Sequence, residues 1–169
     1  KSGLLKVVGE IDKDISFVTM DSREAAKGGL FVAVKGTRVD GHDFINDVVD
    51  SVIATVVCEV LPDDLKPEVT YVMVKNTSIA LGIIASNFYD KPSAKLNLIG
   101  VTGTNRKTTT VSLLFRLFMS LGYKVGMIST IENRINNDIL PSTHTTPDSI
   151  RLNKLIYEKA NVFLFVDLL

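Results

Sequence analysis

The sequence predicts an α/β protein, and three observations support this fold class. Short runs of β-branched and aromatic residues alternate with segments of helical spacing along the chain. Residues 96–121 read as strand, loop and helix, the order that a phosphate-binding loop on a parallel sheet requires. Hydrophobic residues make up 46% of the 169 residues and charged residues 22%, which suffices for a buried core in one large or two small domains.

The charge balance argues against two classes of partner. The chain has 19 basic and 19 acidic residues, so its net charge is zero and no electrostatic footprint for nucleic acid or an anionic membrane is expected. No apolar stretch approaches the ~20 residues that span a bilayer, so we expect no membrane insertion.

The single cysteine, Cys58, lies in an apolar run and excludes an internal disulfide. It is expected to be a buried structural thiol and not a nucleophile. No signal peptide is visible, although the chain begins at Lys1 without Met, and a cytoplasmic, reducing compartment fits.

The first half of the chain has the pattern of a small α/β domain. Helical spacing predicts helices over residues 43–50, with an N-cap near Asp43, and over residues 77–89. The polar turn that contains Pro92 is the best domain boundary, which gives domains 1–92 and 93–169. Strands are predicted at residues 16–20, 30–34, 52–60 and 71–74.

The second half predicts a parallel sheet. A strand at residues 96–101 and another at 123–129 flank an apolar helix over residues 109–121, with Gly122 suited to its C-terminal cap. Residues 131–140 are polar and predict an exposed loop or a hairpin. A helix is expected to start with Thr146 as N-cap and Pro147 in its first turn, followed by a buried strand at 162–166.

The loop at the start of the long helix carries the chemistry of phosphate binding. Its backbone N–H groups and the helix dipole favour an anion, Lys107 can reach the outer phosphates of a nucleotide, and the Thr108 hydroxyl can ligate Mg²⁺. The alternative is an ordinary strand-to-helix turn with a surface lysine. The general motif has glycine where this chain has Arg106. The candidate nucleotide-binding residues are Gly103, Thr104, Asn105, Arg106, Lys107, Thr108 and Thr109.

Four stretches together resemble the Mur ligases, most closely the branch that adds the third residue of the peptidoglycan stem peptide. They agree with that family in order and spacing along nearly the whole chain. The stretches are Gly100–Thr110, Asp21-Ser22-Arg23, Gly29–Gly36 with Asp40-Gly41-His42, and Thr143–Asp148.

The resemblance implies where substrates bind. It makes residues 1–92 a uridine-nucleotide domain and residues 93–169 the start of a P-loop-type, parallel-sheet ATPase domain, which uses ATP and Mg²⁺. On sequence alone, Asp21-Ser22-Arg23 is a common turn, and His42 is expected to be a hydrogen-bonded loop residue and not a metal ligand. By position, the family's uridine contacts fall on Met20, Ser22, Thr37, Arg38 and Val39, and its muramoyl-peptide contacts on His144, Thr145 and Thr146.

The implied reaction is ATP-dependent amide formation on a UDP-N-acetylmuramoyl-dipeptide. ATP phosphorylates the terminal carboxylate, and the amine of an incoming amino acid, lysine, diaminopimelate or another, attacks the acyl phosphate. Lys107 would act catalytically on the phosphates and Thr108 would hold Mg²⁺. The resemblance covers about a third of such an enzyme, so this chain alone is expected to be inactive.

Two alternatives stay open. The chain could be a non-catalytic nucleotide-binding module, because Arg106 replaces glycine, the C-terminal domain is missing, and the family's Mg²⁺-binding Glu falls on Val166, or on Asp167 after a one-residue slip. An unrelated P-loop protein is disfavoured by the three flanking stretches.

Residues 162–169 end the chain as an apolar strand, and we expect such a sheet edge to cause self-association.

Overall fold

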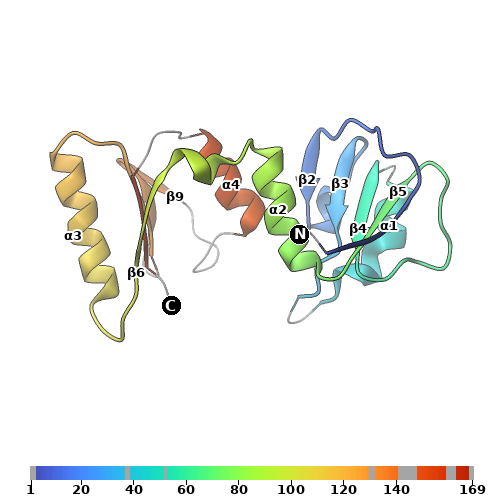
Figure 1. The fold of residues 1–169 in the computed structure, drawn as a ribbon, viewed down its shortest axis with the longest axis horizontal. Coiled ribbons are helices and arrows are strands. Elements are labelled where there is room, and N and C mark those ends of the chain that lie inside the picture. Colours follow the sequence, from blue (N-terminus) through green and yellow to red (C-terminus); the bar gives the residue numbers. More distant parts are fainter. Residues whose placement is uncertain are drawn as a thin grey trace. The chain divides into compact units, whose positions relative to one another are not determined.

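The computed structural model describes residues 3–36, 39–51, 53–129, 132–140, 148–158 and 163–167. It confirms the α/β fold class: the chain divides into two compact units, Lys1–Phe88 and Tyr89–Leu169, each with a five-stranded sheet (Figure 1). The domain boundary that we expected after Pro92 falls inside the second unit. The assignment of the two units to a uridine nucleotide and to ATP stays a prediction.

The sheet of the first unit has the strand order β1-β5-β4-β3-β2. The strands β2 to β5 run parallel, and β1 is antiparallel to β5 at one edge. The four predicted strands are confirmed. The strand β1 was not predicted, because its apolar residues do not alternate with polar ones and lie largely exposed. The strands are β1 (Leu4–Val8), β2 (Phe17–Thr19), β3 (Gly29–Val32), β4 (Thr55–Cys58) and β5 (Thr70–Val74).

Short helical segments follow the parallel strands. A 3₁₀ turn η1 (Ser22–Glu24) follows β2, η2 (Gly41–Phe44) leads into α1 (Ile45–Asp50), and α2 (Thr77–Phe88) follows β5. The N-cap of α1 is Phe44, next to the expected Asp43, but it forms no side-chain cap bond. The capping side chain is Asp40, at the start of η2, because the chain enters α1 through this 3₁₀ turn.

One hydrophobic cluster of the first unit lies between α1 and the sheet. All four residues of β4 are buried, as a central parallel strand requires. Cys58 is fully buried there, as predicted, and burial raises its pKa to about 11, so the thiol stays protonated at neutral pH. The core cluster comprises Phe31, Ala33, Ile45, Val48, Val49, Ile53, Val56, Cys58, Val69 and Tyr71.

The sheet of the second unit has the order β6-β10-β7-β8-β9. Its first three strands are parallel, and β8 and β9 form an antiparallel hairpin, one of the two alternatives left open for residues 131–140. The strands are β6 (Asn97–Val101), β7 (Val125–Ile128), β8 (Asn133–Ile135), β9 (Asp138–Leu140) and β10 (Phe163–Asp167).

The expectation that the last strand forms a sheet edge is wrong. β10 pairs with β6 on one side and with β7 on the other, so both of its backbone edges are hydrogen-bonded and Leu164 and Phe165 are buried. The edges of this sheet are β6 and β9 in the part of the chain that the structure describes.

Two helices cover the second sheet on opposite faces. α3 (Lys107–Ser120) packs through Val111 and Phe115 against β7 and β10, and α4 (Ser149–Glu158) packs through Ile156 against Leu164. A 3₁₀ turn η3 (Pro92–Lys95) precedes β6. α3 begins two residues earlier than predicted, which places Lys107 and Thr108 in its first turn. At its other end Gly122 has φ 83°, the left-handed conformation of a C-terminal cap, as predicted.

None of the helices within the described ranges combines the length and the hydropathy that a membrane span requires.

Candidate functional site

The predicted phosphate-binding loop connects the carboxyl end of β6 to the N-terminus of α3. Because β6, β10 and β7 are parallel, their carboxyl ends meet at this edge of the sheet, where open α/β sheets bind ligands. Gly103, Thr104, Asn105 and Arg106 are all exposed. The loop is therefore accessible to a nucleotide from solvent.

Arg106 has a left-handed backbone, with φ 62° and ψ 13°. This conformation costs a residue with a Cβ atom about 1–2 kcal/mol, and glycine adopts it freely. As N-cap of α3, Arg106 forms no side-chain cap bond, while its carbonyl oxygen accepts the N–H of Thr110 at 2.9 Å and its hydroxyl at 3.0 Å. The left-handed backbone explains why the general motif has glycine at this position. The effect of the guanidinium on a phosphate stays a prediction.

Lys107 turns back onto the loop. Its Nζ donates a hydrogen bond of 2.8 Å to the carbonyl oxygen of Gly103, so the ammonium lies across the solvent-exposed loop. The backbone N–H groups of the first turn of a helix lack partners within the helix and carry its positive dipole end. Thr108, the predicted Mg²⁺ ligand, is partly buried in that turn, and Thr109 is exposed.

The residues that the structure describes provide no protein-bound metal cage at this site. Within the described ranges, no group of three or more His, Cys, Asp or Glu side chains could hold a metal ion. Val166, one of the two positions suggested for the Mg²⁺-binding Glu, packs instead into the core beside α4. The backbone of Asp167, the other position, pairs with Val101 at the end of β6.

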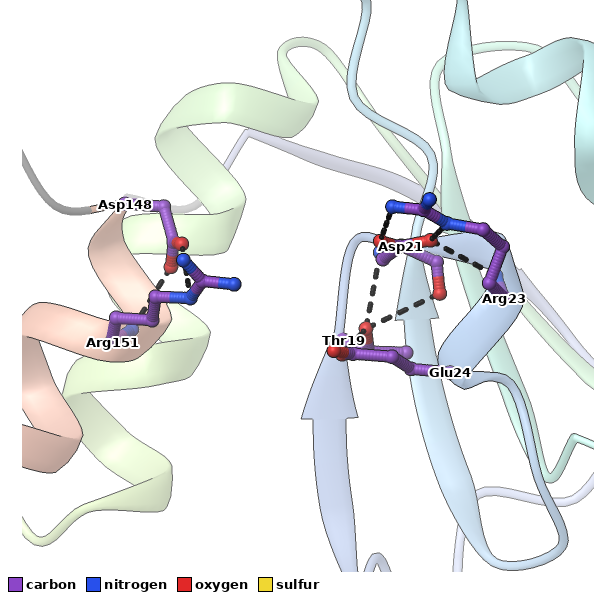
Figure 2. A network of polar contacts seen from close by, with 6 residues as sticks. All are labelled: Thr19, Asp21, Arg23, Glu24, Asp148 and Arg151. Carbon is purple, nitrogen blue, oxygen red and sulfur yellow. Dashed lines mark hydrogen bonds and ion pairs between the residues drawn. The ribbon is translucent and has the colours of Figure 1, made fainter. Parts of the chain in front are cut away.

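Met20 and Ser22 lie on either side of Asp21, at the carboxyl end of β2. Figure 2 shows how Asp21 fixes this turn: Oδ1 accepts the backbone N–H of Arg23 at 3.0 Å and its Nε at 2.8 Å, and Oδ2 accepts the guanidinium at 2.5 Å. Below it, the buried Thr19 hydroxyl accepts the N–H of Asp21 at 3.0 Å and donates to Glu24 at 2.9 Å. The turn that carries Ser22 is thus held from both sides.

The second predicted uridine segment follows β3. Since β2 and β3 are parallel neighbours, their carboxyl ends lie at the same edge of the sheet. Val39, which is 56% exposed, therefore belongs to the same edge as Met20, which is 43% exposed. Thr37 and Arg38 lie outside the described residues.

The predicted muramoyl-peptide residues His144, Thr145 and Thr146 also lie outside the described residues, as do Thr146 and Pro147 as a helix start. The first described residue of this stretch is Asp148, which caps α4. Its Oδ1 accepts the N–H of Arg151 at 2.9 Å, and its Oδ2 lies 3.3 Å from Nε of the same arginine (Figure 2).

Sequence reasoning identified Asp21-Ser22-Arg23 as a turn but missed the similar turn that begins at Asp40. Asp21 and Asp40 each accept the backbone N–H two residues ahead, at Arg23 and at His42. Asp21 lies two residues after the end of β2, and Asp40 is the second residue of the β-bridge with Lys35. An aspartate side chain that accepts the backbone N–H two residues ahead is typical of such turns, so an aspartate just past a strand is the signal that could have found them.

Two family models match consecutive parts of the chain. The Mur ligase family catalytic domain matches residues 14–89, and the Mur ligase middle domain matches residues 101–165.

A curated relative and two solved structures extend this match. The UDP-N-acetylmuramoyl-L-alanyl-D-glutamate--2,6-diaminopimelate ligase of Cytophaga hutchinsonii is 53% identical over 157 residues, which are 92% of this chain and 32% of that ligase. The chain therefore spans about a third of the length of the curated relatives that it matches.

Among solved structures, a UDP-N-acetylmuramoyl-L-alanyl-D-glutamate--2,6-diaminopimelate ligase superposes with a TM-score of 0.71 at 20% identity, over 94% of this chain and 34% of that one. The MurF ligase from Thermotoga maritima in complex with ADP superposes with a TM-score of 0.58 at 23% identity, over 89% and 31%. At these identities the likeness concerns the fold.

Proposed function

Because the chain belongs to the Mur ligase family, we propose that it is part of an ATP-dependent amide ligase of peptidoglycan synthesis. Its substrates would be ATP, UDP-N-acetylmuramoyl-L-alanyl-D-glutamate and 2,6-diaminopimelate. The names of the relatives support the choice of diaminopimelate over lysine. The proposal places the reaction in the cytoplasm, where ATP is available.

The strand–loop–helix arrangement of β6 and α3 is the observation that carries this proposal. The γ-phosphoryl group of ATP would move to the terminal carboxylate of the dipeptide, leaving ADP. The amine of diaminopimelate would then attack the acyl phosphate, form the amide and release inorganic phosphate. Phosphoryl transfer needs mainly positioning and charge neutralisation, which the backbone N–H groups of 103–107 and the ammonium of Lys107 would supply.

Thr108 fits a role at Mg²⁺. Its hydroxyl is a hard oxygen ligand in the first turn of α3, directly after the lysine that closes over the loop. Mg²⁺ that binds together with a nucleotide keeps several water and phosphate ligands. One protein oxygen, the hydroxyl of Thr108, is therefore enough as the contribution of this chain to the Mg²⁺ site. Bound Mg²⁺ would neutralise charge on the transferred phosphoryl group.

The left-handed Arg106 favours a second candidate function. A Cβ and a long side chain would occupy the place where the loop backbone approaches a phosphate. The chain would then keep the uridine pocket while ATP binding is lost. In that case it would be a catalytically inactive, Mur-ligase-like binding module.

The first unit is tested by calorimetric titration of UDP-N-acetylmuramoyl-L-alanyl-D-glutamate into the 169-residue chain without ATP. We expect weak binding that Ser22→Ala reduces about threefold to tenfold, the worth of one hydrogen bond. Ser78→Ala, which removes an exposed hydroxyl from α2, is the matched control and should leave affinity unchanged. Absence of both heat and chemical-shift changes at millimolar ligand would overturn the uridine site.

A further inference from the structure

Both ring nitrogens of His42 are engaged, and they join two different parts of the first unit. Nδ1 lies 2.6 Å from Oδ1 of Asp40, at the start of η2. Nε2 lies 2.9 Å from the backbone nitrogen of Glu59, directly after β4. The side chain of His42 is 18% exposed, so these contacts are largely shielded from water. The expectation that His42 is a hydrogen-bonded loop residue is confirmed.

The two partners determine which nitrogen carries the proton. A backbone N–H can only donate, so Nε2 must offer its lone pair to Glu59. A carboxylate can only accept, so Nδ1 must carry the hydrogen that Asp40 receives. The geometry therefore requires the neutral imidazole protonated at Nδ1, and the same Asp40 oxygen also accepts the backbone N–H of His42 at 3.0 Å.

The connection continues from Glu59 to α2. Oε1 of Glu59 accepts the backbone N–H of Thr77 at 2.8 Å and its hydroxyl at 3.0 Å, and Thr77 is fully buried at the start of the helix. His42 thus links the segment after β3 to a point that the end of β4 and the start of α2 already fix.

The segment that His42 holds is a narrow loop with paired sides. Lys35 and Asp40 form an antiparallel bridge, and the N–H of Gly36 donates to the carbonyl oxygen of Val39 at 2.9 Å. The N–H of Gly41 donates to the carbonyl oxygen of Val34 at 3.0 Å. Val39 lies one residue before the bridge, so its position depends on where the returning side of the loop is anchored.

We propose that His42 is a positioning residue for the uridine nucleotide: by bridging Asp40 and the backbone of Glu59 it holds the returning side of the loop, and with it Val39, at the edge where Met20 and Ser22 lie. This inference rests on the proposed function of the first unit. It uses described residues alone and assigns no nucleotide contact to His42 itself.

Three substitutions separate the two hydrogen bonds of the His42 ring, one to Asp40 and one to Glu59. His42→Gln places an amide oxygen near the position of Nε2, so it can still accept from Glu59. His42→Asn places an amide nitrogen near the position of Nδ1, so it keeps Asp40 and cannot reach Glu59. His42→Phe keeps a planar ring but loses the hydrogen bonds to both Asp40 and Glu59. Asp43→Asn, on an exposed neighbour of the same 3₁₀ turn, is the control.

The measurement is affinity of the 169-residue chain for UDP-N-acetylmuramoyl-L-alanyl-D-glutamate, with the thermal midpoint of each variant. We expect His42→Phe and His42→Asn, which lose the bond to Glu59, to bind about tenfold more weakly, and His42→Gln, which keeps that bond, about threefold or less. If His42 had a purely structural role, the affinity of the variants would follow their thermal midpoints. It would not depend on whether the new side chain can accept the hydrogen bond from Glu59. Asp43→Asn should bind as the unmodified chain does.

Imidazole ¹⁵N shifts give a second readout that needs no variant. We expect the Nδ1-protonated tautomer in the unmodified chain, and an Nε2-protonated ring would overturn the proposal. Equal affinity of the unmodified chain and His42→Phe would overturn it as well. If the unmodified chain does not bind the uridine compound, the proposed function of the first unit fails, whereas the tautomer still decides whether the bridge exists.

Discussion

At Arg106 two physical effects oppose each other at a single residue. A guanidinium is a good bidentate partner for phosphate, so an added charge could strengthen nucleotide binding. The same residue stands in a left-handed backbone, in the loop that we propose approaches the phosphate. Steric exclusion cannot be offset by a charge in the same space, because the phosphate must enter before the charge can act on it. We therefore expect the steric effect to dominate.

Arg106→Gly should restore Mg-ATP binding. The comparison uses a chimera in which this chain replaces the matching third of the Cytophaga hutchinsonii ligase, with Arg106 or with glycine, and nucleotide affinity is measured by calorimetry. We expect at least about tenfold tighter binding with glycine, or 1.4 kcal/mol. In the 169-residue chain alone, relief of the left-handed backbone should raise the free energy of unfolding by about 1 kcal/mol. Equal affinity in the two chimeras would show that the loop tolerates arginine, and the non-catalytic alternative would lose its support.

Glu59 gives a pH-dependent contribution to stability. The hydrogen bonds from the backbone and hydroxyl of Thr77 lower the pKa of Glu59 below its ordinary value. A carboxylate with a lowered pKa in the folded state stabilises the fold above its unfolded-state pKa, and this contribution is lost as the pH falls through the lowered value.

Glu59→Gln should therefore cost about 0.3–1 kcal/mol at pH 7, the worth of a charge at a helix N-terminus, and nothing at a pH below the pKa of the folded state. Urea unfolding of both chains between pH 7 and pH 3 measures the difference. Glu68→Gln, at an exposed glutamate, serves as the control. A difference that stays constant with pH would contradict the charged contact.

Single residues were predictable where their chemistry is local. The burial of Cys58 follows from its apolar neighbours, and the left-handed position of Arg106 from the glycine that the motif requires. The bridge through His42 was not predictable in detail, because its partner Glu59 is 17 residues away in sequence and meets it only when β3 and β4 pair. Which side chains such a long-range contact joins is decided by the sheet and not by local spacing.

At the scale of elements, close approach of backbones explains why Gly41 carries no side chain. A Cβ at this position would come within 2.8 Å of the backbone nitrogen and oxygen of Val34, on the other side of the loop. In α2, by contrast, a Cβ at Gly82 would meet nothing within 4 Å.

The two alanine substitutions should therefore change stability in opposite directions. Gly41→Ala should lower the free energy of unfolding by about 1–3 kcal/mol and weaken uridine binding, because the sides of the loop must separate. Gly82→Ala should raise the free energy of unfolding by about 0.5–1 kcal/mol, the gain of alanine over glycine within a helix. Chemical denaturation checks both, and a neutral Gly41→Ala would show that the loop accommodates the methyl group.

Most elements follow from periodicity, and strand order does not. The strands β2 to β7 and the helices α2 and α3 lie within a few residues of their predicted bounds, because burial imposes the spacing that the sequence shows. The position of β10 between β6 and β7 depends on how α4 carries the chain back to the sheet, and residues 131–162 do not encode that path in their hydrophobic pattern. That β10 runs parallel to the other strands was predictable, whereas its pairing with β6 and β7 was not.

At the scale of the whole molecule, self-association is expected at β6, one of the two edge strands of the second sheet as the structure describes it, and not at the last strand. Leu98 on β6 is 60% exposed, and unpaired strand edges recruit other chains. We expect the 169-residue chain to self-associate through this edge, so that its mass in size-exclusion chromatography with light scattering rises with concentration.

Leu98→Lys should shift this equilibrium toward the monomer, because a charged side chain on an edge strand opposes pairing. Leu113→Lys is the matched control, since Leu113 is 61% exposed and lies on α3 and not on a strand. Equal effects of the two substitutions would indicate general solubility and not edge pairing, and a monomer at all concentrations would rule out the association.

The central place of β10 also decides when the second unit can form during synthesis on a ribosome. β6 and β7 share no hydrogen bonds and meet only through β10, so three parallel strands cannot assemble until residues 163–167 have left the exit tunnel. The first unit has all its strands once β5 has been made, and its last helix, α2, follows directly. Domains generally fold in the order in which they are synthesised, and long-range strand pairing is slow. A nascent chain should therefore carry a folded first unit while the predicted phosphate-binding loop still lacks the sheet that holds it.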